Sequence, residues 1–161
     1  MRQRQVAMAF RTHGGKRRGA GRKPKGTRSS EHHKARPEHD PRHPVHVTIR
    51  IVGNVGGLRR RDIYLALREA TIVTAKRADF RITHMSIQRD HIHLLVEADH
   101  KAALSKGVQG FSISAARQIN KAITARGGDR RTGKVISDRF HARPLTSPRA
   151  VRNAISYALN N

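Results

Sequence analysis

The sequence predicts an α+β domain in which helices pack on one face of an antiparallel sheet. Two observations lead to this fold class. Polar and apolar residues alternate over 46–51, 81–88 and 91–97, which is the period of a half-buried strand. Apolar residues recur every three or four positions over 62–77 and 101–125, which is the period of an amphipathic helix. The sheet and the helices therefore alternate along the chain.

The first half of the domain begins with the strand at 46–51, which the glycines at 53, 56 and 57 end. Asp62 is a plausible N-cap for the helix at 62–77. A tight turn at Arg89-Asp90 joins the next two strands into a hairpin. The apolar positions of the first helix follow spacings of four, three and three: Ile63, Leu67, Ala70 and Val73.

The second half begins with the long helix at 101–125, which Gly127-Gly128 ends. A further strand is expected between Val135 and Leu145. Ser147-Pro148 then starts a last helix, with serine as the cap and proline in the first turn. The order strand, helix, strand, strand, helix, strand, helix is that of a ferredoxin-like sheet.

The chain is strongly basic. It has 161 residues with 34 Lys+Arg against 11 Asp+Glu, a formal net charge of +23, which favours a polyanionic partner such as nucleic acid. Residues 1–44 hold 13 of the basic residues against three acids and almost nothing apolar, which predicts a disordered basic arm ahead of a folded domain at 45–161. Part of this arm resembles a short hook for the DNA minor groove, and a generic solvated linker is the alternative; its basic residues are Arg17, Arg18, Arg22, Lys23 and Lys25.

Composition also excludes several kinds of site and several classes of protein. The sequence has no cysteine, so disulfides and thiolate zinc sites are ruled out. It shows neither the ~20-residue apolar stretch of a spanning helix nor the apolar core of a signal peptide, so we expect no membrane partner and a cytoplasmic, nucleoid-associated location, with an arginine-rich transit peptide as the alternative. Six Phe and Tyr residues and no Trp favour backbone and base-edge contacts over base stacking.

The predicted hairpin has one polar and one apolar face. A two-residue turn pairs Ser86 with His93 and Met85 with Leu94, and directly opposed residues share a face. The first strand fits the same scheme, with Val45, Val47, Ile49 and Ile51 inward. The polar side chains gathered on the outer face are His84, Ser86, Gln88, His91 and His93 from the hairpin and His46, Thr48 and Arg50 from the first strand. This face is the expected site.

His91 and His93 are the most informative pair on that face. Two imidazoles at i and i+2 of one strand can reach a single metal ion, and two histidines with a carboxylate could bind zinc. No third ligand stands at a short fixed spacing. The pair alone is equally compatible with two solvated or hydrogen-bonded histidines in a chain with 11 of them.

In its wider context the pair resembles the HUH signature of single-tyrosine transposases, and within them the REP-associated and small insertion-sequence enzymes. The resemblance covers about 45–161. It rests on His46-Val47-Thr48, on His91-Ile92-His93 with the apolar run after it, on Asp138-Arg139-Phe140-His141, and on a terminal helix with the pattern Tyr-x-x-x-Asn at Tyr157 and Asn161. Asp90 departs from the asparagine often found before the first histidine, and Asn161 is the last residue, so we expect the end of this helix to fray.

The resemblance implies a transposase that cuts and rejoins single-stranded, hairpin-forming DNA through a 5′-phosphotyrosine on Tyr157. It implies a divalent ion, Mn²⁺ or Mg²⁺, on His91 and His93, completed by Asn161 or Gln88. Arg50 and Arg143 would contact the DNA and favour the tyrosine anion. A catalytically decayed or domesticated DNA-binding derivative and a basic RNA-binding protein are the alternatives, and a homodimer is left open.

Overall fold

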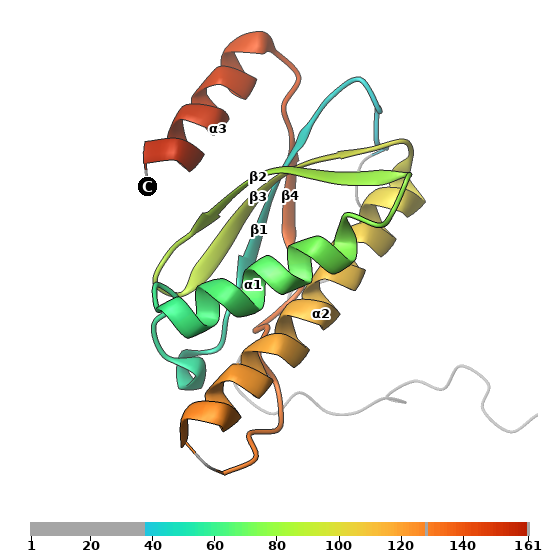
Figure 1. Cartoon of the computed structure of the whole chain (residues 1–161). Coiled ribbons are helices and arrows are strands. Elements are labelled where there is room, and N and C mark those ends of the chain that lie inside the picture. The colour runs from blue at the N-terminus through green and yellow to red at the C-terminus, as the bar shows by residue number, and fades with distance from the viewer. Residues whose placement is uncertain (1–37, 128, 161) are drawn as a thin grey trace, which may run out of the picture. The chain divides into compact units, whose positions relative to one another are not determined.

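The computed structural model describes residues 38–127 and 129–160. Four strands form one antiparallel sheet in the order β2-β3-β1-β4, which is the strand order of a ferredoxin-like fold (Figure 1). The elements in chain order are β1 Val45–Arg50, the 3-10 turn η1 Gly53–Val55, α1 Arg61–Thr74, β2 Phe80–Ile87, β3 His91–Ala98, α2 Lys101–Gly127, β4 His141–Pro144 and α3 Pro148–Asn160. This order confirms the predicted α+β class.

The hairpin of β2 and β3 has the predicted register. Ser86 pairs with His93 and Met85 with Leu94, and the amide of Gln88 donates to the carbonyl of His91 at 2.9 Å. Farther from the turn, the register shifts by one residue at Thr83 in a β-bulge. The bulge lies beyond the histidines, so it leaves the polar face around them unchanged.

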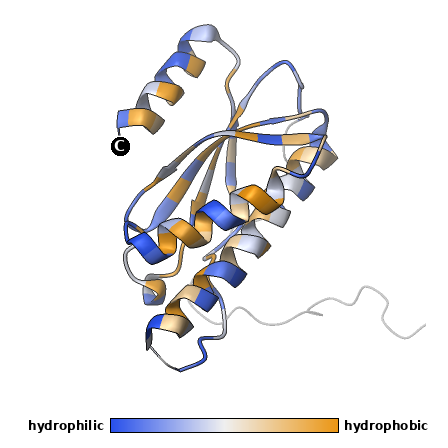
Figure 2. Ribbon diagram, in the orientation of Figure 1, coloured by the Kyte–Doolittle hydropathy of each residue, from blue (hydrophilic) through white to orange (hydrophobic). Residues whose placement is uncertain are grey.

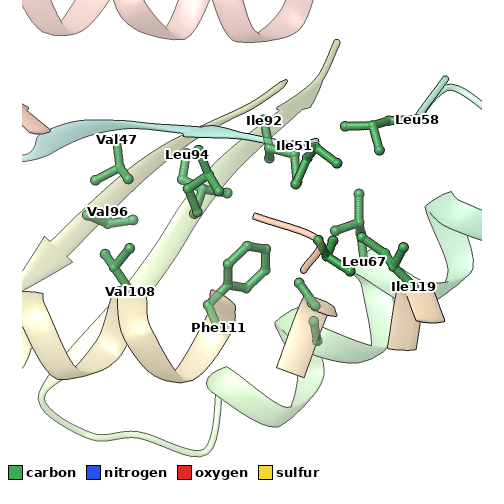
Figure 3. Packing of buried hydrophobic residues seen from close by; sticks show 14 of the residues in the cluster. Val47, Ile51, Leu58, Leu67, Ile92, Leu94, Val96, Val108, Phe111 and Ile119 are labelled. Carbon is green, nitrogen blue, oxygen red and sulfur yellow. The ribbon is translucent and has the colours of Figure 1, made fainter. Parts of the chain in front are cut away.

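The apolar face of the sheet carries the core. The inward side chains of β1 and β3 are fully buried against α1 and α2, as Figure 3 shows for Val108 and Phe111 beneath Leu94 and Val96. Burying these side chains is the main favourable term for such a domain. The largest fully buried side chains are Phe111, Ile49, Leu58, Ile63, Leu67, Ile92, Leu94, Ile119, Val45, Val47, Val96 and Val108.

Helix α3 lies on the other face of the sheet, away from α1 and α2 (Figure 1). The hydroxyl of Ser147 accepts a hydrogen bond from the amide of Ala150 at 3.2 Å, which confirms the predicted cap. The expected docking stripe is only partly covered: Val151, Ala154, Ile155 and Ala158 are half-buried, and α3 has no buried side chain. Helices α1 and α2 therefore pack on one face of the sheet, as predicted, whereas α3 lies on the other face.

Four local expectations need correction. Helix α1 starts at Arg61 after Arg60, not at an Asp62 cap, and Asp62 instead pairs with the Arg60 guanidinium inside the first turn. Helix α1 also ends at Thr74, and α2 extends to Gly127. The last strand is only His141–Pro144, because the segment before it touches the sheet through a single bridge between Ile51 and Ile136.

Residues before 38, with all five predicted basic hook residues, lie outside the described part of the chain. Residues 38–44 are described and contact the sheet and α2: an imidazole nitrogen of His39 bonds the carbonyl of Ala98 at 2.7 Å, and Glu38 pairs with Lys101. Within the described ranges, no helix has the length and apolar character needed to span a membrane.

Candidate functional site

The polar face of the sheet brings histidines from three strands together. The antiparallel pairing sets Thr48 of β1 opposite His93 of β3 on one side and opposite His141 of β4 on the other. Arg50 stands opposite His91, and Arg143 opposite His46. Since opposed residues share a face, all of these side chains belong to one surface.

His93 is the centre of this surface and is 8% exposed. Its Nδ1 lies 3.0 Å from Nε2 of His46 and 3.2 Å from the Thr48 hydroxyl, both on β1. The His46 and His93 rings stack at 4.9 Å with 28° between their planes. Both ring nitrogens of His93 are thus used on the surface, one toward β1 and the other toward α3.

Tyr157 of α3 meets His93 on its other nitrogen. The tyrosine hydroxyl lies 3.4 Å from Nε2 of His93, across 64 residues of chain, and the rings cross at 89°. Tyr157 is 43% exposed, so its hydroxyl borders both the histidines and solvent. Tyr64, the other tyrosine, is 51% exposed on α1, and α1 covers the opposite face of the sheet.

His91 is oriented by its neighbour Asp90. Its Nδ1 lies 2.7 Å from a carboxylate oxygen of Asp90, and this bond holds the pKa of Asp90 below its usual range. The His91 and His93 rings are 4.7 Å apart at 89°. The aspartate, which departs from the asparagine expected in this place, therefore has a direct structural role: it fixes the ring of His91 through Nδ1.

Burial keeps the central histidines neutral. Loss of solvent, with smaller contributions from His46 and His91, lowers the pKa of His93 from 6.5 to about 4. Loss of solvent also lowers the pKa of His46, helped by Arg143 and His141. At neutral pH both imidazoles therefore keep a nitrogen lone pair.

The donor set suits a divalent ion at His91 and His93. Metal-bound histidines commonly hold their second nitrogen in a hydrogen bond, and here Nδ1 of His91 faces Asp90 while Nδ1 of His93 faces His46. This leaves the Nε2 atoms as donors, and that of His93 would exchange its contact with the Tyr157 hydroxyl for the ion. Among the described residues, no group of three His, Cys, Asp or Glu side chains is placed so that it could hold a metal ion. A third protein ligand would therefore have to be of another type or come from outside this part.

The proposed third ligands differ in their surroundings. Asn161 lies outside the described residues. Gln88 is already bonded at both ends of its amide, since its oxygen accepts from Arg59 at 3.1 Å and its nitrogen donates to the Ser86 hydroxyl at 2.9 Å. A ligand role for Gln88 would use the second lone pair of this oxygen, so it stays a prediction.

The sequence reasoning placed His46 and Thr48 on the correct face but gave them no role. Local alternation shows which residues point outward. It does not show that Thr48 pairs with His93, which depends on the register between β1 and β3. His141 was noted only as part of the resembling segment, and its place opposite Thr48 also follows from register.

Known proteins resemble this chain in sequence and in fold. The family model described as "Transposase IS200 like" matches residues 44–155, most of the domain; the match ends before Tyr157. No curated protein matches the sequence. Among solved structures, a REP-associated tyrosine transposase bound to a REP hairpin has a TM-score of 0.50 at 18% identity, covering 81% of this chain and 70% of that one.

A protein from Deinococcus radiodurans R1, assigned to the transposases, has a TM-score of 0.49 at 12% identity, covering 82% of this chain and 97% of that one. At 18% identity the REP-associated structure shows a shared fold alone, whereas the family model spans more than half of the chain. The chain therefore belongs to the IS200-like transposase family.

Proposed function

We propose that this transposase cuts and rejoins single-stranded DNA with Tyr157 as the nucleophile. The DNA it takes is expected to contain a hairpin, as does the DNA bound to the REP-associated transposase of similar fold. The observation that carries the proposal is the 3.4 Å approach of the Tyr157 hydroxyl to Nε2 of His93. Two chain segments far apart in sequence thus bring a nucleophile to the strand that carries the paired histidines.

The chemical step exchanges one phosphate ester for another. The Tyr157 oxygen attacks the scissile phosphorus, an O–P bond forms, and the bond between phosphorus and the 3′ oxygen breaks. The phenolic proton passes to water, and the departing 3′ oxygen takes up a proton to become a hydroxyl. The product is a 5′-phosphotyrosine and a free 3′ end. Because the ester is retained, the reverse attack by a new 3′ hydroxyl joins strands.

The chain's own residues would prepare this step. His91 and His93 would hold a divalent ion, Mn²⁺ or Mg²⁺, which supplies Lewis-acid polarisation of the phosphate when bound. The described neighbours of these histidines fix both rings, so the donors need little rearrangement. Arg50 and Arg143 are exposed on the same face and would bind backbone phosphates beside the scissile bond.

The test is covalent capture. The full chain is incubated with Mn²⁺ and a pool of hairpin-forming single strands with random flanks and a 3′ label. The 5′-phosphotyrosine retains the 3′ portion of the DNA, so a labelled band that survives denaturation is expected at the protein's position. Chelation of the metal should abolish the band.

Two matched variants identify the nucleophile. Tyr157→Phe removes one oxygen and keeps the ring, so the band should disappear while DNA binding persists. Tyr64→Phe makes the same change on the opposite side of the sheet and should leave the band unchanged. A band with Tyr157→Phe would refute the nucleophile. No band with any wild-type reaction, with binding intact, would favour the non-catalytic derivative, and preference for a matched RNA pool would favour the RNA-binding alternative.

A further inference from the structure

We propose that His46 is a positioning residue that accepts a hydrogen bond from Nδ1–H of His93 and so directs the lone pair on Nε2 of His93 toward Tyr157. The inference rests on the proposed function for its catalytic meaning. Its geometric part concerns two histidines and one tyrosine of this chain, and it can be tested without any DNA cleavage.

His46 and His93 lie in close contact on neighbouring strands. Nε2 of His46 is 3.0 Å from Nδ1 of His93, a good hydrogen-bond distance, and the two rings stack at 4.9 Å. His46 is half-buried and His93 is 8% exposed, so water competes little for this bond. Both residues lie within strands, and a register in which Leu95 faces His46 and His93 faces Thr48 holds them diagonally adjacent.

A neutral imidazole carries one proton, so this chain of groups has two consistent arrangements. In the first, the Tyr157 hydroxyl donates to Nε2 of His93, and Nδ1–H of His93 donates to Nε2 of His46. In the second, every donor and acceptor is reversed, and Nε2–H of His93 points at the tyrosine oxygen. Only the first leaves the Nε2 lone pair available to a metal ion.

Tyr157 favours the first arrangement. Phenol oxygen lone pairs are delocalised into the ring, so a phenol donates more readily than it accepts, and an imidazole nitrogen is the stronger acceptor. Thr48 does not choose between arrangements, because its hydroxyl, 3.2 Å from Nδ1 of His93, can either donate or accept. His46 differs from Thr48, because its Nε2 either carries a proton or does not. It can therefore accept a hydrogen bond only if Nδ1 of His93 is protonated.

Imidazole nitrogen spectra test the geometric part directly. The metal-free full chain, labelled with ¹⁵N-histidine, gives the protonation of each ring nitrogen at neutral pH, and His93→Gln identifies the His93 signals by their loss. The proposal expects a protonated Nδ1 and an unprotonated Nε2 in His93. The opposite pattern in the wild-type protein would overturn it.

Mn²⁺ affinity tests the consequence. His46→Phe keeps a stacked ring without an acceptor and should weaken Mn²⁺ binding by about 10-fold or more, which is typical when the partner of a ligand is lost. His46→Gln, whose amide oxygen reaches a similar position, should restore most of the affinity. Thr48→Val removes the other partner and should bind Mn²⁺ like the wild type.

The outcomes separate this inference from the proposed function. Equal Mn²⁺ affinity in His46→Phe and the wild type overturns the positioning role even if the covalent band forms. If His93 has the predicted tautomer but the wild type forms no covalent band, the result supports the role of His46 and contradicts the catalytic proposal alone. Failure of His46→Gln to rescue a weakened His46→Phe also overturns the role, because restoring a hydrogen-bond acceptor at this position would then not restore the Mn²⁺ affinity.

Discussion

Gly107 of α2 packs closely against the start of β2. A Cβ added at this residue would lie 2.2, 2.4 and 2.6 Å from three ring atoms of Phe80, at the start of β2. Phe80 is buried in the core cluster, so its ring has little room to move. Gly110, one turn farther along the same helix, is exposed and has nothing within 4 Å of an added Cβ. The two glycines form a matched pair.

The expected energies follow from this difference. Replacing a helical glycine with alanine gains about 1 kcal/mol in helix propensity. Overpacking a core costs about 1–3 kcal/mol, and contacts below 3 Å with three atoms of one ring place Gly107→Ala at the upper end. Gly107→Ala should therefore lose roughly 2 kcal/mol of unfolding free energy, while Gly110→Ala should gain roughly 1 kcal/mol.

Urea unfolding of the two variants measures the difference. Circular dichroism gives the midpoint and the slope for each, and an unchanged slope licenses direct comparison. In a protein that already carries Phe80→Leu, Gly107→Ala should cost less unfolding free energy than it does in the wild type. The smaller side chain at position 80 leaves room for the added methyl group. Equal stabilities for Gly107→Ala and Gly110→Ala would refute the close packing of α2 on β2.

Three further outcomes follow from charge, burial and sequence. Because the folded state lowers the pKa of His93 to about 4, it binds fewer protons than the unfolded state between pH 6.5 and 4, so stability should fall as pH drops through that window. The urea midpoints of His93→Gln should fall less steeply there. A pH dependence identical to that of the wild type would contradict the lowered pKa of His93. Deleting residues 1–37 should weaken binding to all DNA sequences and flatten its salt dependence, measured by fluorescence anisotropy, and an unchanged salt slope would mean that this segment neutralises no phosphates. Amide hydrogens of α3 should exchange faster than those in the middle of α1 and α2, because α3 buries no side chain, and equal protection would show that the helix opens only with the whole domain.

Local periodicity predicted most of this fold, and the reason is visible in particular elements. The strand at β1 alternates buried and half-buried residues from Val45 to Ile49, and the hairpin pairing of Ser86 with His93 follows from the length of its turn. The segment before β4 was predicted as part of one strand between Val135 and Leu145. It instead makes a single bridge, between Ile51 and Ile136, flanked by backbone hydrogen bonds of Val135 and Ser137, and regular pairing with β1 is confined to β4.

The site was predicted less completely than the fold because it depends on contacts between distant elements. His91, His93 and Tyr157 could be chosen from residue type, spacing and family resemblance. The partners that orient the two histidines are of different kinds. Asp90 adjoins His91 in the sequence and could have been noticed, whereas His46 reaches His93 only through the pairing of β1 with β3.

The orientation of α3 explains why apolar residues along it line an open groove rather than the core. Tyr157 faces the sheet through His93, and Ile155 stands two residues away, a spacing that places side chains on different sides of a helix. Val151, Ile155 and Leu159 line an open groove along α3, and Leu159 is 71% exposed. Figure 2 shows apolar positions along α3, a helix that lies outside the core. If Val151, Ile155 and Leu159 instead packed on the sheet, the tyrosine would turn away from the histidines. The contact of Tyr157 with His93 and the open groove along α3 are therefore two results of one helix rotation.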